Sequence, residues 1–159
     1  MDTSKPKIFI ASSGRAILLA EALANYLSDI AEVQRWYRSF QPGFGTLDSL
    51  LTEAGDCDFA AVLLTEDDVL HKGELEVLAP RDNCVFELGL FIGALNLEPR
   101  RCFMLTSTSR DALPSDLKGR TYIPIKKLTS KEFDDEAKCR EAIENPIGRF
   151  AISPGMQIR

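Results

Sequence analysis

The stretch that most constrains the fold is DFAAVLLT, residues 58–65, an apolar run with no alternation between apolar and polar positions. A strand with one face in water alternates, whereas a strand in the middle of a parallel sheet is covered on both faces and is apolar throughout. Residues 58–65 are therefore predicted to form a central strand of a parallel sheet.

On either side of this segment, predicted strands and helices alternate along the chain, as a parallel sheet requires. Apolar residues recur at helical spacing after each of the first two predicted strands. Residues 81–95 are predicted to form a largely apolar helix, and residues 131–144 a polar one. Pro124 favours an edge position for the last strand, and the charged residues 66–81 are predicted to be a surface excursion. This order predicts an α/β fold of the flavodoxin-like type, a parallel five-stranded sheet with helices on both faces. The predicted strands are residues 7–11, 31–37, 58–65, 101–107 and 121–125.

Length and charge limit the functional classes. The chain has 159 residues, enough for one domain, which we assign to residues 1–145, with residues 146–159 as a tail or linker. A net charge of -5 argues against nucleic-acid binding, which needs a dense cationic surface.

No apolar segment is long enough to cross a membrane, and the start lacks a secretory signal, so we expect a cytoplasmic protein with no membrane partner. The four cysteines are too widely spaced for a zinc site, and in a reducing compartment they are expected to act as small apolar residues.

A single carboxylate stands out in RDNCVFELGLFIGAL, residues 81–95, because Glu87 is the only charge between Cys84 and Leu95. If Asp82 caps this helix, Asn83 and Glu87 lie four residues apart on one face, near the carboxyl ends of the strands. Buried charges are costly, so a protein keeps one that is either paired or used. Glu87 would have a purely structural role if it formed a salt bridge with Arg81 or capped a backbone amide. The spacing of the residues alone does not decide between this structural role and a catalytic one.

Three further patterns are weaker. Gly89 and Gly93 are unfavourable in a helix interior, which suggests close packing of another backbone on that face. The sequence GFGTLD at 43–48 lacks the third glycine of a dinucleotide fingerprint and is more typical of a flexible turn. The acids of LTEDD, residues 64–68, are expected in a solvated loop rather than a magnesium site, because no phosphate-binding element accompanies them.

Taken together, IFIASSGR, VQRWYRSFQPGFGTLDSLL, FAAVLLTEDD, APRDNCVFELGLFIGAL and LPSDLKG resemble the bacterial TIR-like family of predicted nucleotide-binding proteins. In that family the domain is the effector half of cyclic-nucleotide-activated anti-phage proteins such as TIR-STING fusions. The resemblance covers roughly residues 7–125 and rests on the order of the motifs. A departure is Cys84, where many relatives are expected to carry valine.

The resemblance implies a TIR fold and cleavage of the nicotinamide–ribose bond of NAD+, giving nicotinamide and ADP-ribose. NAD+ is then the substrate, with no cofactor and no metal. The family's catalytic glutamate corresponds to Glu87. The residues that would line the substrate site are Ser12, Ser13, Trp36, Phe40, Arg81, Asp82 and Asn83.

The resemblance also implies partners. Many TIR enzymes act only when assembled, so we expect self-association through TIR domains. A cyclic-nucleotide sensor, in cis beyond residue 159 or in trans, would supply the activating signal.

The chemistry needs only one carboxylate. Nicotinamide leaves as a neutral molecule and requires no general acid, unlike a sugar oxygen, and an ionised Glu87 would stabilise the oxocarbenium-like transition state. Two alternatives stay open at this point. A nucleoside deoxyribosyltransferase-like N-glycosidase would also use an essential glutamate, and a non-catalytic TIR module would need only packing surfaces.

Overall fold

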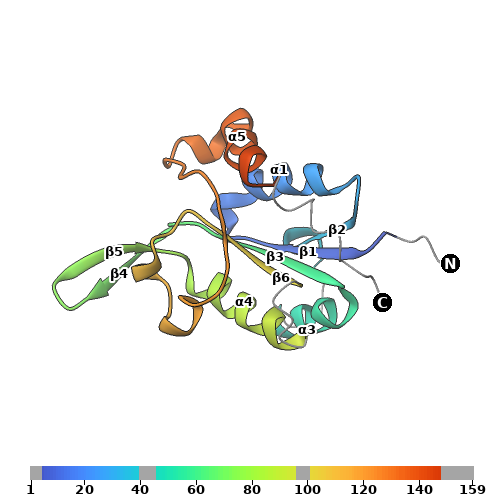
Figure 1. The fold of residues 1–159 in the computed structure, drawn as a ribbon, viewed down its shortest axis with the longest axis horizontal. Coiled ribbons are helices and arrows are strands. Elements are labelled where there is room, and N and C mark those ends of the chain that lie inside the picture. The colour runs from blue at the N-terminus through green and yellow to red at the C-terminus, as the bar shows by residue number, and fades with distance from the viewer. Residues whose placement is uncertain (1–4, 40–45, 96–100, 148–159) are drawn as a thin grey trace.

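The computed structural model describes residues 5–39, 46–95 and 101–147 (Figure 1). Its main sheet has the strand order β2-β1-β3-β6-β7, and every neighbouring pair is parallel. β3 is in the centre and is buried at every position, as its sequence predicts. β7 is at the edge, where Pro124 removes no hydrogen bond from a central ladder. The strands are β1 Lys7–Ala11, β2 Glu32–Arg35, β3 Phe59–Leu64, β6 Cys102–Thr106 and β7 Ile123–Pro124.

Helices cover both faces of this sheet, which confirms the predicted α/β architecture. α1 (Ile17–Leu27) and α5 (Glu136–Ile147) lie on one face, and α3 (Thr46–Asp56) and α4 (Asp82–Ala94) lie on the other (Figure 1). The short helix α2 spans Trp36–Ser39. Four 3-10 turns complete the chain: η1 Gly14–Ala16, η2 Arg110–Ala112, η3 Ser115–Leu117 and η4 Glu132–Asp134. Among the residues described, no helix is both long and apolar enough to cross a membrane.

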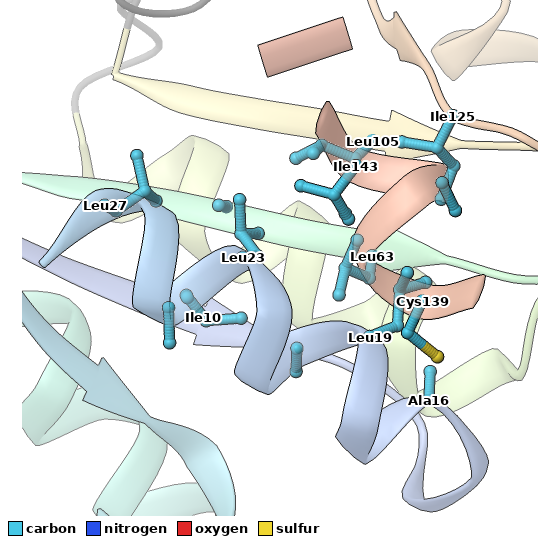
Figure 2. Packing of buried hydrophobic residues seen from close by; sticks show 14 of the residues in the cluster. Ile10, Ala16, Leu19, Leu23, Leu27, Leu63, Leu105, Ile125, Cys139 and Ile143 are labelled. Carbon is cyan, nitrogen blue, oxygen red and sulfur yellow. The ribbon is translucent and has the colours of Figure 1, made fainter. Parts of the chain in front are cut away.

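The face under α1 and α5 is a dry apolar core (Figure 2). Leu19, Leu23 and Leu27, one helical turn apart on α1, pack on the strands and are almost completely buried. Ile143 and Cys139 of α5 reach the same cluster. The four cysteines are buried free thiols, as expected.

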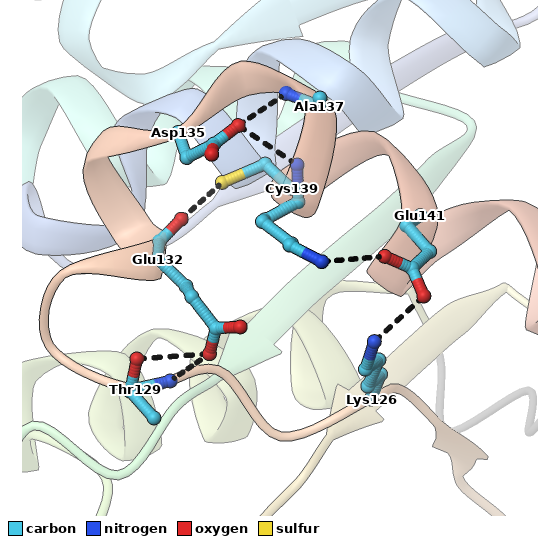
Figure 3. Close-up of polar contacts among 8 residues, drawn as sticks. Lys126, Thr129, Glu132, Asp135, Ala137, Cys139 and Glu141 are labelled. Atoms are coloured by element: carbon cyan, nitrogen blue, oxygen red, sulfur yellow. Dashed lines mark hydrogen bonds and ion pairs between the residues drawn. The ribbon is translucent and has the colours of Figure 1, made fainter.

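Polar contacts fix α5 at the outside of this core (Figure 3). The carboxylate of Asp135 accepts the backbone N–H groups of Ala137 and Lys138, at 2.9 and 3.1 Å, and so caps the helix. Lys126 Nζ donates to Glu141 Oε1 at 2.7 Å and ties the helix to the segment after β7.

The opposite face holds a second cluster, in which α4 contributes Cys84, Leu88 and Phe91. These residues follow the i, i+4, i+7 spacing of one helix face, and the ring of Phe91 stacks on that of Phe9 with centroids 4.8 Å apart. The expectation of close backbone packing at Gly89 and Gly93 is wrong, because a Cβ added at either glycine would meet nothing within 4 Å. Both glycines face solvent.

Two local predictions also need correction. The strand predicted to reach residue 37 ends at Arg35, and Trp36 starts the short helix α2. The surface excursion at 66–81 contains an antiparallel hairpin, β4 Asp68–Lys72 and β5 Leu75–Ala79. Gly73, with φ of 64°, allows its tight turn. The hairpin projects from the sheet, and exposed side chains on both strands hide the usual alternation (Figure 1).

Candidate functional site

The candidate site lies at the carboxyl edge of the sheet, where β1 and β3 end. Ser12 and Ser13 follow β1, and Thr65 to Asp67 follow β3. α4 starts at this edge, after the hairpin, and packs on β3 and β6. In parallel α/β sheets ligands bind at this edge, because loops from neighbouring strands open there.

Glu87 lies in the second turn of α4, beside the buried stripe that contains Cys84 and Leu88. Its side chain is partly buried, and Oε2 is fully buried with no hydrogen-bond partner among the described residues. Burial raises the pKa of this carboxyl from 4.5 to about 7, and no cation among the described residues opposes the shift. Near neutral pH the group therefore exists in both charged and neutral forms.

The segment after β1 forms a polar arrangement with α2. The indole Nε1 of Trp36 donates to Ser12 Oγ at 2.9 Å, and Ser12 Oγ donates to the carbonyl oxygen of Ser13 at 3.1 Å. Ser13 is 4% exposed, and its own Oγ has no hydrogen-bond partner among the described residues. Trp36 also packs against the cluster that holds Cys84 of α4. The structure thus brings three of the predicted site residues together, on the same side of the sheet as α4.

The residues at the start of α4 behave differently. Arg81 is exposed and lies with its Nε 3.7 Å from Asp68 Oδ1, at the base of the hairpin. The helix begins at Asp82, so Arg81 rather than Asp82 occupies the cap position. Asp82 is in the first turn and accepts the backbone N–H of Asn83 at 2.8 Å. Arg81 is therefore not the ion-pair partner of Glu87 that a purely structural explanation required.

Asn83 is exposed and is not hydrogen-bonded to Glu87 Oε2. No hydrogen bond to that oxygen therefore supports a role for Asn83 in orienting Glu87. Phe40 and the GFG turn at 43–45 lie outside the described residues.

A residue that sequence reasoning missed is Asp67, which was expected in a solvated loop. Its Oδ2 accepts the hydroxyl of Thr65 at 3.0 Å, whereas Oδ1 is buried with no partner among the described residues. Glu66 is also partly buried and pairs with Lys127, and of these three acids only Asp68 is exposed. The signal in the sequence was the position of these acids at the end of a central strand.

Cys84 is close to both Glu87 and Asp67, each of which has one oxygen without a partner among the described residues. The pKa of its thiol is raised to about 12, first by burial and then by the negative charges of Glu87 and Asp67. Both carboxylates therefore lie within electrostatic reach of one buried residue. Within the described residues no group of three His, Cys, Asp or Glu side chains is placed to hold a metal ion. The site offers acceptor oxygens, which suit the hydroxyl donors of a sugar.

The sheet order and this carboxyl-edge site define a TIR domain. The TIR domains of the activated Roq1 resistosome that recognises the effector XopQ have the same fold, with a TM-score of 0.56 over 90% of this chain and 99% of theirs. At 12% sequence identity this likeness concerns the fold alone.

The sequence places the chain in a particular family of TIR domains. Residues 7–127 match the model of the CAP12/Pycsar effector protein TIR domain, and the chain belongs to that family. It is 32% identical over 149 residues to CD-NTase-associated protein 12 of Sphingobacterium faecium, covering 92% of this chain and 44% of that protein. It is 38% identical over 128 residues to the Pycsar effector protein PaPycTIR of Pseudomonas aeruginosa, covering 79% and 41%. The chain thus spans less than half the length of these relatives.

Proposed function

We propose that this TIR domain cleaves the bond between nicotinamide and ribose in NAD+, and that Glu87 is its catalytic carboxylate. The observation that carries the proposal is the buried oxygen of Glu87, which has no hydrogen-bond partner in the described part of the chain and lies at the ligand-binding edge of the sheet. A carboxyl group with a buried oxygen that lacks a hydrogen-bond partner among the described residues, and with a pKa near neutrality, is typical of a catalytic group.

The proposed reaction breaks the bond from the ribose anomeric carbon to the pyridinium nitrogen. The bonding electrons go to the nitrogen, so nicotinamide leaves neutral without a general acid. Positive charge develops on the ribose, and the ionised Glu87 stabilises it in a site with little water. Water then adds to the anomeric carbon and loses a proton to solvent, which gives ADP-ribose.

Two further groups suit the binding of ribose hydroxyls. Ser13 Oγ and Asp67 Oδ1 are both buried without partners among the described residues, and both follow strands that end at this edge. Each could accept a hydrogen bond from a sugar hydroxyl, which would orient the scissile bond. The indole of Trp36 holds Ser12, the neighbour of Ser13, through its hydrogen bond.

The biological role that we propose is that of an effector in anti-phage defence, which acts in the cytoplasm by depleting NAD+. The relatives are named as CD-NTase-associated and Pycsar effector proteins, which supports activation by a cyclic nucleotide. The parts of those relatives that this chain does not match are long enough for a sensor domain. We propose that such a sensor, in cis or in trans, promotes self-association of the TIR domains.

A nucleoside N-glycosidase is the second candidate, because one observation favours it. Neutral nucleobases are poor leaving groups and need a proton, and Asp67 lies with Glu87 near Cys84, where it could act as the acid. Such an enzyme would release bases from nucleosides and leave NAD+ intact.

A chromatographic assay with concentrated, crowded protein separates the two candidates. NAD+ and the adenosine and cytidine nucleotides are incubated with the wild type and with Glu87→Gln. We expect equal amounts of nicotinamide and ADP-ribose from the wild type and almost none from the variant. Release of bases from the nucleotides without nicotinamide would favour the glycosidase, and no turnover of any substrate would favour a non-catalytic module.

A further inference from the structure

An open cavity of about 400 Å³ lies along the segment that joins β6 to β7. Three of its lining side chains are cationic, Arg110, Lys118 and Arg120, and one is aromatic, Tyr122. The cavity is within the size range of small-molecule sites.

The two arginines of this cavity have no carboxylate partner among the described residues. The guanidinium of Arg110 lies over the ring of Tyr122, 5.4 Å from its centroid, and this contact holds it at the cavity. Arg120 is partly buried, and neither arginine forms an ion pair or a side-chain hydrogen bond with a described residue. Lys118 Nζ is 3.8 Å from Oδ1 of Asp111, a residue with a 93% exposed side chain.

Three cations around one cavity are unusual in this chain, which has 24 acidic and 19 basic residues. Like charges held together repel one another and destabilise the fold unless an anion offsets them. Arginine is well suited to phosphate, because its planar guanidinium donates two parallel hydrogen bonds to neighbouring oxygens. An anion with several phosphate oxygens would satisfy both guanidinium groups and the ammonium at once.

Arg120 lies close enough to Cys102 to lower the pKa of its thiol, against a larger effect of burial that raises it. Cys102 is the first residue of β6 and therefore lies at the amino end of that strand.

We propose that this cavity binds the phosphate groups of a small phosphorylated ligand, with Arg110 and Arg120 as the main donors. Two sources share this chemistry. One is the diphosphate of NAD+ extending from the site at Glu87, an assignment that rests on the proposed function. The other is a separate nucleotide, whose binding needs no catalytic activity.

Calorimetric titration with inorganic pyrophosphate tests the binding directly. The proteins compared are the wild type, the double variant Arg110→Gln/Arg120→Gln, and the matched control Arg140→Gln, which removes an exposed arginine on α5. We expect wild type and control to bind alike and the double variant to bind about tenfold more weakly or worse. Equal binding by all three proteins, or no binding by the wild type, would overturn the proposal. Circular dichroism of each variant verifies that it is folded.

Competition then identifies the source of the phosphate. The titration is repeated with Glu87→Gln protein saturated with NAD+, because that variant is expected to leave the dinucleotide intact. Loss of pyrophosphate binding assigns the cavity to the substrate's diphosphate, and unchanged binding assigns it to a separate phosphorylated ligand. Both results require pyrophosphate binding by the free protein, so a failure of the phosphate site is distinguishable from a failure of NAD+ cleavage.

Discussion

Glu21 and Glu87 are both partly buried glutamates on helices, but they differ in what surrounds them. Oε2 of Glu21 accepts a hydrogen bond from Arg35 at 3.2 Å, and Oε1 accepts from Arg38 at 3.1 Å and from the Tyr37 hydroxyl. Oε2 of Glu87 accepts no hydrogen bond from the described residues. Glu21 therefore connects α1 to β2 and α2, whereas Oε2 of Glu87 makes no such connection to a described residue.

The contrast separates two uses of a carboxylate. A buried charge costs free energy, and hydrogen bonds to cationic groups offset that cost at Glu21. The raised pKa of Tyr37, about 12, results from burial and then from its hydrogen bond to Glu21, which favours the protonated phenol. At Glu87 the cost is not offset, and the same physics raises the pKa of the carboxyl itself. The absence of a described partner, rather than burial alone, distinguishes the candidate catalytic residue.

Replacing Glu87 with glutamine should reduce turnover, whereas the same replacement at Glu21 should leave turnover nearly unchanged. We expect Glu87→Gln to reduce nicotinamide release by about 100-fold or more, because the developing positive charge loses its counter-charge. Glu21→Gln should release nicotinamide at close to the wild-type rate per folded molecule. Equal losses of nicotinamide release in the two variants would contradict a catalytic role that is specific to Glu87.

The pH dependence of stability should also differ between wild type and Glu87→Gln. The pKa of Glu87 is raised from 4.5 to about 7, so the folded state holds this proton more tightly than the unfolded state. The resulting stabilisation is fully present below the unfolded pKa and is lost as pH rises through the folded pKa. The melting temperature of the wild type should thus fall relative to that of the variant between about pH 5 and about pH 8. A constant difference across this range would contradict the desolvation of Glu87.

Stability should respond to Glu21→Gln at neutral pH. The substitution removes the charge from a hydrogen-bonded network, and we expect a loss of about 1 kcal/mol in the free energy of unfolding. Denaturant titration measures it, with Glu144→Gln, an exposed site on α5, as the control that should change little. An unchanged midpoint for Glu21→Gln would show that the network contributes little.

A small effect on turnover is expected at Cys84, whose thiol is within electrostatic reach of Glu87 and Asp67. Its thiol has a pKa of about 12, so it stays protonated and behaves as a small apolar group. Cys84→Val should cost less than about 1.5 kcal/mol and leave turnover close to that of the wild type. A large loss of activity in a stable variant would instead place the thiol in the mechanism.

The parts of the molecule that follow one strong pattern could be predicted from the sequence. The unbroken apolar run of β3 identified the central strand, and the helix predicted within 81–95 placed Glu87 near the carboxyl ends of the strands. The hairpin β4–β5 was missed because its exposed side chains leave no alternation to detect. Trp36 was placed on a strand because local propensity does not reveal a helical turn fixed by a tertiary hydrogen bond to Ser12.

The candidate site also has features that the sequence predicts and features that it does not. The polarity of Ser12 and Ser13 at the end of a strand was visible in the sequence. Whether Arg81 pairs with Glu87 or with Asp68 depends on where the hairpin returns, and spacing along the chain does not determine that. The unpartnered oxygen of Asp67 is likewise a property of packing rather than of sequence.

The pH profile of kcat/KM for nicotinamide release from NAD+ tests the central claim, that a desolvated Glu87 acts in its ionised form. Such a profile reports the pKa values of essential groups in the free enzyme. We predict activity that rises with pH and is half-maximal near pH 7, the pKa of Glu87. A midpoint near 4.5, the ordinary value for glutamate, or a profile flat through neutrality would contradict it.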